Sequence, residues 1–426
     1  MSTLPLGRAL TLLVLLWATT YVGFAADSAA WLQWGGPRRN FIVDAPPLTT
    51  NWPSGGPRQV WRRSLGEGHS AIVADGPRVY TMYRPLGVMS LIRRSQYETV
   101  VAMNTSTGNT EWEYTYDAPT GGLDLEYGAG PHSTPLIIGD RLYAVSSLKQ
   151  IFALDKQTGK VVWSHDMMKE FGAPRPDRGY APSPIQYKNA IIVPAGGPNQ
   201  ALIAFDRQSG AVLWKNGSYE IAPASPILIN ADGQEQLVVF GANEVLGVNP
   251  ADGATLWSHS HRTQYGLNIA TPVWLPGHRL LISSAYNNGT RLLQLSRASG
   301  KWSAQEVWFQ NRMRVHFGTI IPFSDFAIGS SGDFGPCPTV AIDLATGSVL
   351  WQSRDFARAN FVYADNKLIV VDEDGNLGMA TASRQGLTVI AKAPVLSGKA
   401  WTAPTLVGTR LYVRDRKSIL ALELSN

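Results

Sequence analysis

The stretch Ala153-Leu-Asp155-Lys-Gln-Thr158-Gly159-Lys-Val-Val-Trp163 decides the fold, because the chain repeats it. Close copies begin at Ala204 and Ala341, and looser copies begin at Ala102 and Gly247. Self-similarity at a regular spacing is the signature of a repeat architecture, in which one small structural unit occurs many times. We therefore interpret the chain of 426 residues as one repetitive domain rather than as two or three ordinary ones.

Each part of the repeat has a structural meaning. The short acidic side chain of Asp155 is suited to accept hydrogen bonds from turn amides, and Gly159 supplies a position with positive φ. The pattern thus predicts a hairpin turn followed by a strand. Because side chains alternate along a strand, we expect Gly159, Val161 and Trp163 on one face, with the tryptophan filling the gap to the next sheet. This role accounts for much of the count of 14 tryptophans.

A second hairpin follows each tryptophan. It opens in most copies with Ser/Thr-Pro and continues with two apolar runs around a turn, as in Thr134-Pro135-Leu-Ile-Ile-Gly-Asp-Arg-Leu-Tyr143. Proline is tolerated at the start of a strand because no ladder hydrogen bond is lost there. Two hairpins give four strands per unit, and turn glycines about 40–50 residues apart fit one propeller blade. In the unit around Gln294, either Trp302 or Trp308 takes the tryptophan position.

The two ends of the chain complete each other. Val60-Trp61-Arg62 is a tryptophan strand without its Ala-x-Asp partner, and Leu420-Ala-Leu-Glu-Leu424 is such a partner without a tryptophan. We therefore predict an all-β fold, an eight-bladed β-propeller of four-stranded antiparallel blades over residues 31–426, with its ring closed by the N- and C-terminal strands. The alternatives are seven blades, because some copies are degenerate, and an open solenoid with exposed terminal edges.

The first residues predict export. Arg8 precedes an apolar run from Ala9 to Ala18, and small residues follow at a suitable distance for cleavage, so we predict a signal peptide over residues 1–25. The alternative is an uncleaved membrane anchor. No cysteine follows the apolar run, which argues against a lipoprotein anchor, and the single Cys337 excludes an intramolecular disulfide. We expect a periplasmic or secreted protein with no transmembrane segment after signal cleavage.

The repeat Ala-x-Asp-x-x-Thr-Gly-x-x-x-Trp, followed by Ser/Thr-Pro, resembles the pyrroloquinoline-quinone (PQQ) repeat of quinoprotein alcohol dehydrogenases and of BamB, an outer-membrane assembly lipoprotein. The segment Trp31-Leu-Gln-Trp34-Gly-Gly-Pro37-Arg-Arg-Asn40 also looks like the lead-in of exported PQQ-binding-like propellers. The resemblance implies the fold more firmly than a function. It implies adjacent cysteines and acidic calcium ligands for the dehydrogenases and a lipid-bearing cysteine for BamB, and we find none of these features in this chain.

The segments that lead into the innermost strands of a propeller surround the mouth of its central channel. Here they are rich in aromatic, histidine and basic residues, which suit a planar, anionic small ligand. The long loops 84–98, 117–130 and 171–179 are predicted to lie over the same face. A lining that is polar only because the channel is wet is the alternative. The predicted ligand-binding residues are His69, Tyr127, His132, Tyr180, Asn268, Arg314, His316, Lys399 and Trp401.

Composition and charge narrow the function. The formal net charge is only +5 and no run of lysine or arginine occurs, so we expect no nucleic-acid partner. We predict a non-catalytic, monomeric binding or scaffold protein of the cell envelope, with an envelope protein partner or a small ligand and without a bound metal. The alternative is a PQQ-dependent oxidoreductase that holds the quinone, with calcium, at the channel mouth. A third reading is binding of, or enzymatic work on, an envelope polysaccharide or small metabolite at the same mouth.

Overall fold

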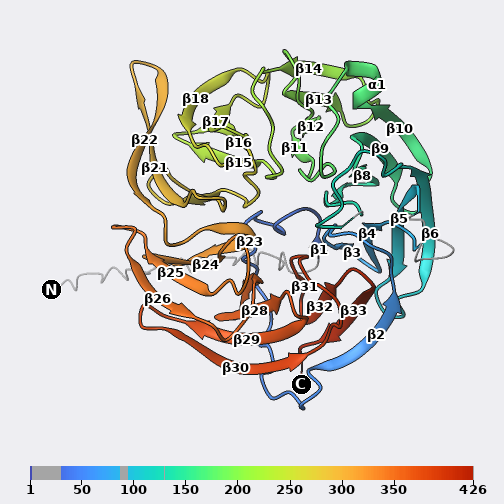
Figure 1. Ribbon diagram of the computed structural model, residues 1–426, viewed down its shortest axis with the longest axis vertical. Helices are drawn as coiled ribbons and strands as arrows, with labels where there is room; N and C mark the ends of the chain where they lie inside the picture. The colour runs from blue at the N-terminus through green and yellow to red at the C-terminus, as the bar shows by residue number, and fades with distance from the viewer. Residues whose placement is uncertain (2–29, 87–94, 129, 426) are drawn as a thin grey trace.

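Eight antiparallel sheets, the blades, follow one another around a central channel (Figure 1). The computed structural model describes residues 1, 30–86, 95–128 and 130–425. Among these residues the short helix α1 (Met167–Phe171) is the one element that is not a β-strand. The predicted all-β, eight-bladed propeller is therefore confirmed.

Blades 1 to 4 are each built from consecutive strands, with the innermost strand first. Blade 1 contains β3 (Val73–Asp75), β4 (Arg78–Tyr83), β5 (Tyr97–Asn104) and β6 (Thr110–Asp117), and β1 (Ala30–Trp31) is added at its inner edge. Blade 2 contains β7 (Leu136–Ile138), β8 (Arg141–Val145), β9 (Gln150–Asp155) and β10 (Val161–Asp166). Blade 3 contains β11 (Ile185–Tyr187), β12 (Ala190–Pro194), β13 (Leu202–Asp206) and β14 (Val212–Asn216). Blade 4 contains β15 (Ile227–Ala231), β16 (Gln234–Phe240), β17 (Glu244–Val248) and β18 (Thr255–Ser260).

Blades 5 to 7 follow the same order, and blade 8 combines strands from both ends of the chain. Blade 5 contains β19 (Val273–Leu275), β20 (Arg279–Ser283), β21 (Thr290–Ala298) and β22 (Lys301–Gln310). Blade 6 contains β23 (Val315–Pro322), β24 (Phe326–Ser331), β25 (Thr339–Asp343) and β26 (Val349–Ser353). Blade 7 contains β27 (Ala359–Ala364), β28 (Lys367–Asp372), β29 (Asn376–Ala382) and β30 (Leu387–Pro394). Blade 8 contains β31 (Thr405–Val407), β32 (Arg410–Arg414), β33 (Ser418–Glu423) and β2 (Arg58–Ser64).

Blade 8 closes the ring. Strand β2 from the start of the domain pairs antiparallel with β33 from its end, with Trp61 opposite Ala421 and Arg62 opposite Leu420. Figure 1 shows the blue β2 beside the dark red β33 on the rim. The predicted closure by the N- and C-terminal strands is confirmed, and it places β33 inside a sheet, between β32 and β2.

The turns of the repeat form as their residues predict. The Asp155 carboxylate accepts hydrogen bonds from the backbone N–H groups of Gln157 and Thr158 at 3.1 and 2.9 Å. Gly159 follows with φ of 70°, in the left-handed region that other residues adopt at a cost. Asp206 and Asp343 accept the same turn bonds in blades 3 and 6. Satisfied turn amides and a glycine at the strained position together explain why this motif recurs.

The tryptophans join neighbouring blades. The Trp163 indole N–H donates to the backbone carbonyl of Arg207 in blade 3, and its ring covers the turn glycine Gly210 of that blade. Trp112 makes the same two contacts with Lys156 and Gly159 of blade 2. Trp61 of the closing strand repeats both contacts with blade 1, at Thr105 and Gly108. Trp308 of blade 5 repeats them with blade 6, at Leu344 and Gly347. Trp308, and not Trp302, therefore takes the tryptophan position in blade 5.

One detail of the predicted strand is wrong. We expected Val161 and Trp163 on the same face, but Val161 is 41 % exposed while Trp163 is buried. A β-bulge lies between them, so Val161 is opposite Leu154 and Trp163 is opposite Ala153, the adjacent residue. The extra residue of a bulge reverses the alternation. The same register shift occurs between the two outermost strands of all eight blades.

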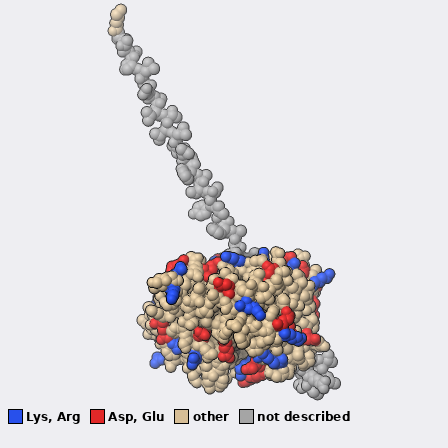
Figure 2. All heavy atoms as spheres, turned by 90° about the horizontal axis from the view of Figure 1, so that it is seen from above, with Lys and Arg blue, Asp and Glu red and all other residues tan. Residues whose placement is uncertain are grey.

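The predicted signal peptide, residues 1–25, lies outside the described part of the chain except for Met1. Within the described ranges, no helix is both long enough and apolar enough to span a membrane. Figure 2 shows the ring from its edge, where basic and acidic side chains are interspersed without a large area of one sign. This mixed surface agrees with the small net charge of the sequence.

Candidate functional site

The central channel contains a cavity of about 170 Å³ on the side where the chain enters the innermost strands. Segments that lead into or begin the innermost strands of seven of the eight blades contribute to its lining, so the ring as a whole builds the site. Five of the predicted residues line this cavity: His69, Tyr127, His132, His316 and Trp401. Whether they bind a ligand stays a prediction, but the repeat does bring them to one place from distant parts of the chain.

Aromatic rings form a continuous wall around the cavity. The imidazoles of His69 and His132 are stacked, with centroids 5.5 Å apart and planes 9° apart. Trp401 lies 5.2 Å from the His69 ring, and Phe317 lies 5.0 Å from Trp401. His316 continues the wall at 4.6 Å from Phe317. Such rings offer flat apolar faces together with a few edge hydrogen-bonding groups.

Tyr127 extends over the cavity from the long loop that precedes blade 2. Its ring lies 6.0 Å from Trp401 of blade 8 and 6.4 Å from His316 of blade 6. The backbone carbonyl of Tyr127 is 2.9 Å from Nε2 of His69, which anchors the loop to blade 1. The loop also rests on the predicted loop 171–179, because the Asp124 N–H donates to the Asp177 carbonyl. The two loops therefore do cover one face, while most of the loop 84–98 is not described.

The lead-in segment closes the other side of the cavity. Leu32 accepts a hydrogen bond from Ile137 of blade 2, and the Trp34 indole N–H donates to Thr271 of blade 5 at 2.8 Å. Val43 then donates to the carbonyl of Tyr363 in blade 7. The segment thus crosses the channel, as its dark blue trace shows in the middle of the ring (Figure 1), and Trp34 lines the cavity. The lead-in segment therefore contributes to the wall of the pocket.

The three histidines of the pocket are uncharged at neutral pH. Burial lowers the pKa of His132 to about 4 and that of His316 to about 3, where Arg358 adds to the effect. Burial also lowers the pKa of His69 well below its ordinary value, with smaller contributions from His132, Arg414 and Arg416. A neutral imidazole has one hydrogen-bond donor and one acceptor, so the pocket offers neutral polar groups between aromatic faces.

Four predicted residues do not line the pocket. Tyr180 is buried in the apolar cluster between blades 2 and 3, and Asn268 is buried with its amide donating to the carbonyl of Gly241 at 2.7 Å. Arg314 lies beside Asp333 at 3.8 Å, away from the lining. Lys399 is the fourth. Alternation turns Tyr180 and Asn268 away from the channel, because the residues on either side of each line the pocket. Arg314 and Lys399 instead point to carboxylates outside the lining.

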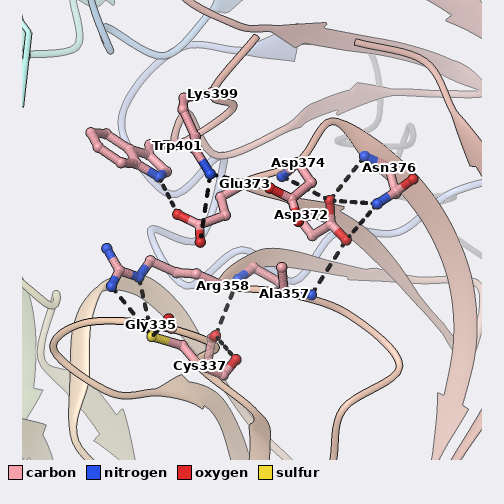
Figure 3. A network of polar contacts seen from close by, with 12 residues as sticks. Gly335, Cys337, Ala357, Arg358, Asp372, Glu373, Asp374, Asn376, Lys399 and Trp401 are labelled. Atoms are coloured by element: carbon pink, nitrogen blue, oxygen red, sulfur yellow. Dashed lines mark hydrogen bonds and ion pairs between the residues drawn. The ribbon is translucent and has the colours of Figure 1, made fainter. Parts of the chain in front are cut away.

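Lys399 and Trp401 belong to one polar network, shown in Figure 3. The Lys399 ammonium lies 3.1 Å from Asp374 and 3.8 Å from Glu373. The Trp401 indole N–H donates to the other oxygen of Glu373 at 2.9 Å, which fixes the ring at the pocket wall. Below it, Arg358 donates to the sulfur of Cys337 at 3.3 Å. Lys399 is therefore a positioning neighbour of the wall and is not directed into the cavity.

Trp34 and Tyr286 are two aromatic residues of the lining that sequence reasoning missed. Trp34 belongs to the lead-in pattern, which precedes the blade strands. The sequence around it contains no signal that this segment crosses the channel. Tyr286 lies between β20 and β21, with φ of 54°, followed by Asn287 with φ of 61°. The sequence Tyr-Asn-Asn-Gly from 286 to 289 is a turn signal, but only the fold shows that the turn brings the tyrosine ring to 4.8 Å from His316.

The pocket does not offer the donors that a calcium-bound quinone needs. The quinone of PQQ carries three carboxylates, and calcium prefers carboxylate and carbonyl oxygens. Among the described residues that line the pocket none is acidic, and its one cation, Arg178, is 3.1 Å from Asp124. No group of three or more metal-binding side chains occurs in the described ranges. The residues present fit an aromatic ring but do not fit its calcium ion.

Comparison with known proteins gives relatives of two kinds. The family model described as outer membrane protein assembly factor BamB matches residues 53–168 and 123–321, which together exceed half of the chain. Outer membrane protein assembly factor BamB of Yersinia pestis is 21 % identical over 306 residues, 68 % of this chain and 73 % of that protein.

Solved structures agree on the ring. The crystal structure of BamB from Moraxella catarrhalis superposes with a TM-score of 0.58 at 18 % identity, covering 87 % of this chain and 98 % of that one. Quinohemoprotein alcohol dehydrogenase ADHIIG from Pseudomonas putida HK5 superposes with a TM-score of 0.62 at 10 % identity, covering 94 % and 80 %. At such identities these likenesses show the fold alone.

Proposed function

The chain belongs to the family of outer membrane protein assembly factor BamB, and from this premise we propose that it is an exported, non-catalytic binding protein of the cell envelope, acting as a monomer. Its relatives are named for the assembly of outer membrane proteins, which makes an envelope protein the expected partner. Because one fold supports many functions, the proposal needs a surface on this chain that suits such a partner.

The observation that carries the proposal is an apolar strip on the outside of two neighbouring blades. The strip consists of Val161 and Val162 on β10 with Val212 and Leu213 on β14, and these side chains are between 39 and 50 % exposed. The Trp163 ring covers Gly210, so the two strands belong to adjoining blades of one seam. Exposed aliphatic side chains that gather on outermost strands favour contact with another protein.

The experiment is cross-linking in native cells with a charged variant of the strip. We expect Val162→Asp combined with Leu213→Asp to lose the envelope protein that the unaltered chain captures, because buried charges without partners oppose association. Ile390→Asp is the matched control, since Ile390 is 42 % exposed on the outer strand of blade 7. Equal capture by the double variant, with its melting temperature unchanged, would contradict the proposed surface.

Export is the second part of the proposal, with cleavage near Ala25. Fractionation of native cells tests it, followed by N-terminal sequencing of the recovered protein. We expect a soluble periplasmic or secreted product that begins close to residue 26. A product that keeps Met1 and sediments with membranes would instead support the uncleaved anchor.

A PQQ-dependent oxidoreductase is the second candidate, favoured by the likeness to quinohemoprotein alcohol dehydrogenase in fold and by the aromatic pocket in the channel. When bound, the quinone would supply the oxidising chemistry, and the aromatic wall would stack on its rings. Within the described part of the chain, the lining contains no acidic ligand for calcium. We therefore expect the purified protein with PQQ and calcium to show neither a shifted quinone absorbance nor dye-linked alcohol oxidation, and either signal would revive this candidate.

A further inference from the structure

The charge of the pocket differs from the cationic ring that the sequence predicts. Arg314 and Lys399 lie outside the lining beside carboxylates, and Arg178 at the rim lies beside Asp124. Behind the wall, the buried Arg414 directs its donors to backbone carbonyls, including those of Ser70 and Met82. The cations around the pocket are thus already paired or hydrogen-bonded, and the lining favours a ligand without a net charge.

His316 shows what that ligand must supply. The residue is 3 % exposed and lines the pocket, yet neither ring nitrogen has a hydrogen-bond partner among the described residues. Leaving a buried polar group unsatisfied costs free energy, so such a group in a cavity points to a missing partner. The ring is neutral and has one donor and one acceptor. A hydroxyl group can satisfy either nitrogen, because it both donates and accepts.

The wall beside His316 suits a saturated ring that presents a face of C–H groups. His69, Trp401 and Phe317 follow one another at centroid distances of 5.2 and 5.0 Å, and the Tyr127 ring lies 6.0 Å from Trp401. A pyranose has C–H faces that pack on aromatic rings and hydroxyls around its edge. It therefore matches both the apolar wall and the neutral imidazole, which a purely apolar or a charged ligand does not.

The aromatic wall continues out of the pocket. Tyr286 lines the pocket and lies 5.2 Å from Tyr265 and 6.3 Å from Phe334. Those two side chains are 57 and 71 % exposed. Tyr286 also has φ of 54°, a strained backbone conformation that directs attention to function when it occurs at a site. An exposed aromatic path that begins inside a pocket fits a ligand longer than one ring.

We propose that the channel mouth binds the end of an uncharged oligosaccharide, with the terminal pyranose against His316 and Trp401 and the next units over Tyr286, Tyr265 and Phe334. This site lies on the channel face and is separate from the outer apolar strip, so it goes beyond the protein-binding function proposed above. Failure of one proposal leaves the other standing, because their variants do not share a residue.

Titration of the purified protein with sugars tests the site. The probes are the tetramers of N-acetylglucosamine and of glucose, their monomers, and tetragalacturonate as an acidic comparison. Trp401 and Trp34 line the pocket, so tryptophan fluorescence reports binding, and calorimetry measures the affinity. We expect a saturable change with at least one neutral tetramer, tighter than with its monomer. No response to either neutral tetramer at millimolar concentration, or tighter binding of tetragalacturonate, would overturn the proposal.

Two variants locate the ligand. His316→Phe keeps a ring of similar size but removes both nitrogens, and we expect affinity for the neutral tetramer to fall about tenfold or more while the melting temperature holds or rises. Phe334→Ala should reduce the affinity for the tetramer to near that for the monomer and leave the monomer unaffected. Tyr97→Ala on blade 1, also exposed, is the control. Unchanged affinity in His316→Phe would contradict the assignment.

Discussion

The seams between blades and the mouth of the channel are built by opposite means. At the seams one contact is repeated: a tryptophan such as Trp112 or Trp163 covers the turn glycine of the next blade and donates to a carbonyl there. At the mouth the lining combines a few residues of the repeat, such as Ser183 and Ser225, with side chains that the repeat does not contain, such as His316, Trp401 and Tyr127.

The difference separates stability from function within one chain. The repeated contacts make a closed ring that tolerates variation elsewhere, and the segments that lead into the innermost strands are free to differ because they belong to loops. Positions where a sequence departs from its own rule are the expected places for a functional site. The pocket is such a place, since it holds buried polar atoms that a purely structural core would avoid.

Removal of the closing strand tests the seams most severely. Deletion of residues 419–426 takes β33 out of the middle of blade 8, so β2 loses its partner and Trp61 loses its place on Gly108. We expect loss of the cooperative melting transition of the whole ring, because a propeller has no independent blades to survive. Deletion of residues 425–426 alone is the control. A transition at the original temperature in the longer deletion would show that closure is not required.

A tryptophan from each region sharpens the comparison. Trp163→Ala should lower the free energy of unfolding by about 3–5 kcal/mol, since it removes a buried ring that packs against Tyr143 and Phe205. Trp401→Ala at the half-buried mouth should cost about 1 kcal/mol or less. Urea unfolding measures both. If the two costs were equal, stability would be spread evenly over the molecule and the distinction would fail.

Acid should destabilise the fold through its buried histidines, of which His132 and His316 line the mouth, while His261, outside the pocket, also has its pKa lowered by burial to about 3. An unfolded histidine takes up its proton near pH 6.5, while His132 and His316 in the folded chain keep pKa values of about 4 and about 3. Between these values the unfolded state binds more protons than the folded state. The contribution of each histidine to the free energy of unfolding is therefore fully present above pH 6.5 and decreases as the pH falls. The loss from pH 7 to pH 5 is about 2 kcal/mol at most for each histidine.

Unfolding measured at several pH values tests this expectation. His316→Phe should flatten the acid limb by removing one of these histidines. His278→Gln on blade 5, where the side chain is 35 % exposed beside Asp232, is the control that should keep it. An acid limb as steep in His316→Phe as in the unaltered chain would place the sensitivity elsewhere.

A pair of glycines gives the smallest effect and isolates one seam contact. Gly139 and Gly159 are turn glycines of blade 2 with φ of 58° and 70°, so alanine is strained at either. A Cβ atom at Gly139 meets nothing within 4 Å, whereas one at Gly159 would lie 2.5 Å from the Trp112 ring. We expect Gly139→Ala to cost about 1 kcal/mol and Gly159→Ala clearly more in thermal unfolding. Equal costs would mean that the tryptophan moves aside freely.

The fold could be predicted in detail because its signals are local. Turn carboxylates, turn glycines and prolines at strand starts act within a few residues of themselves, and eight imperfect copies confirm one another. The bulge before each tryptophan escaped prediction, because alternation is assumed wherever a strand is read from its sequence. For the candidate site, the sequence predicted segments that do surround the channel mouth, but not which of their side chains point into it. Those of Tyr180, Asn268, Arg314 and Lys399 do not line the pocket.

The sequence by itself determined the ring, its number of blades and its closure at Trp61, because each depends on short-range chemistry that repeats. Only the tertiary structure decided the pocket. It brings Trp34 beside the same cavity as Tyr286 and His316, which lie 252 and 282 residues further along the chain, and it turns the predicted lysine and arginine away toward carboxylates. The physical reason is that a contact between loops of different blades leaves no periodic trace in the chain, whereas a turn or a seam leaves the same trace many times.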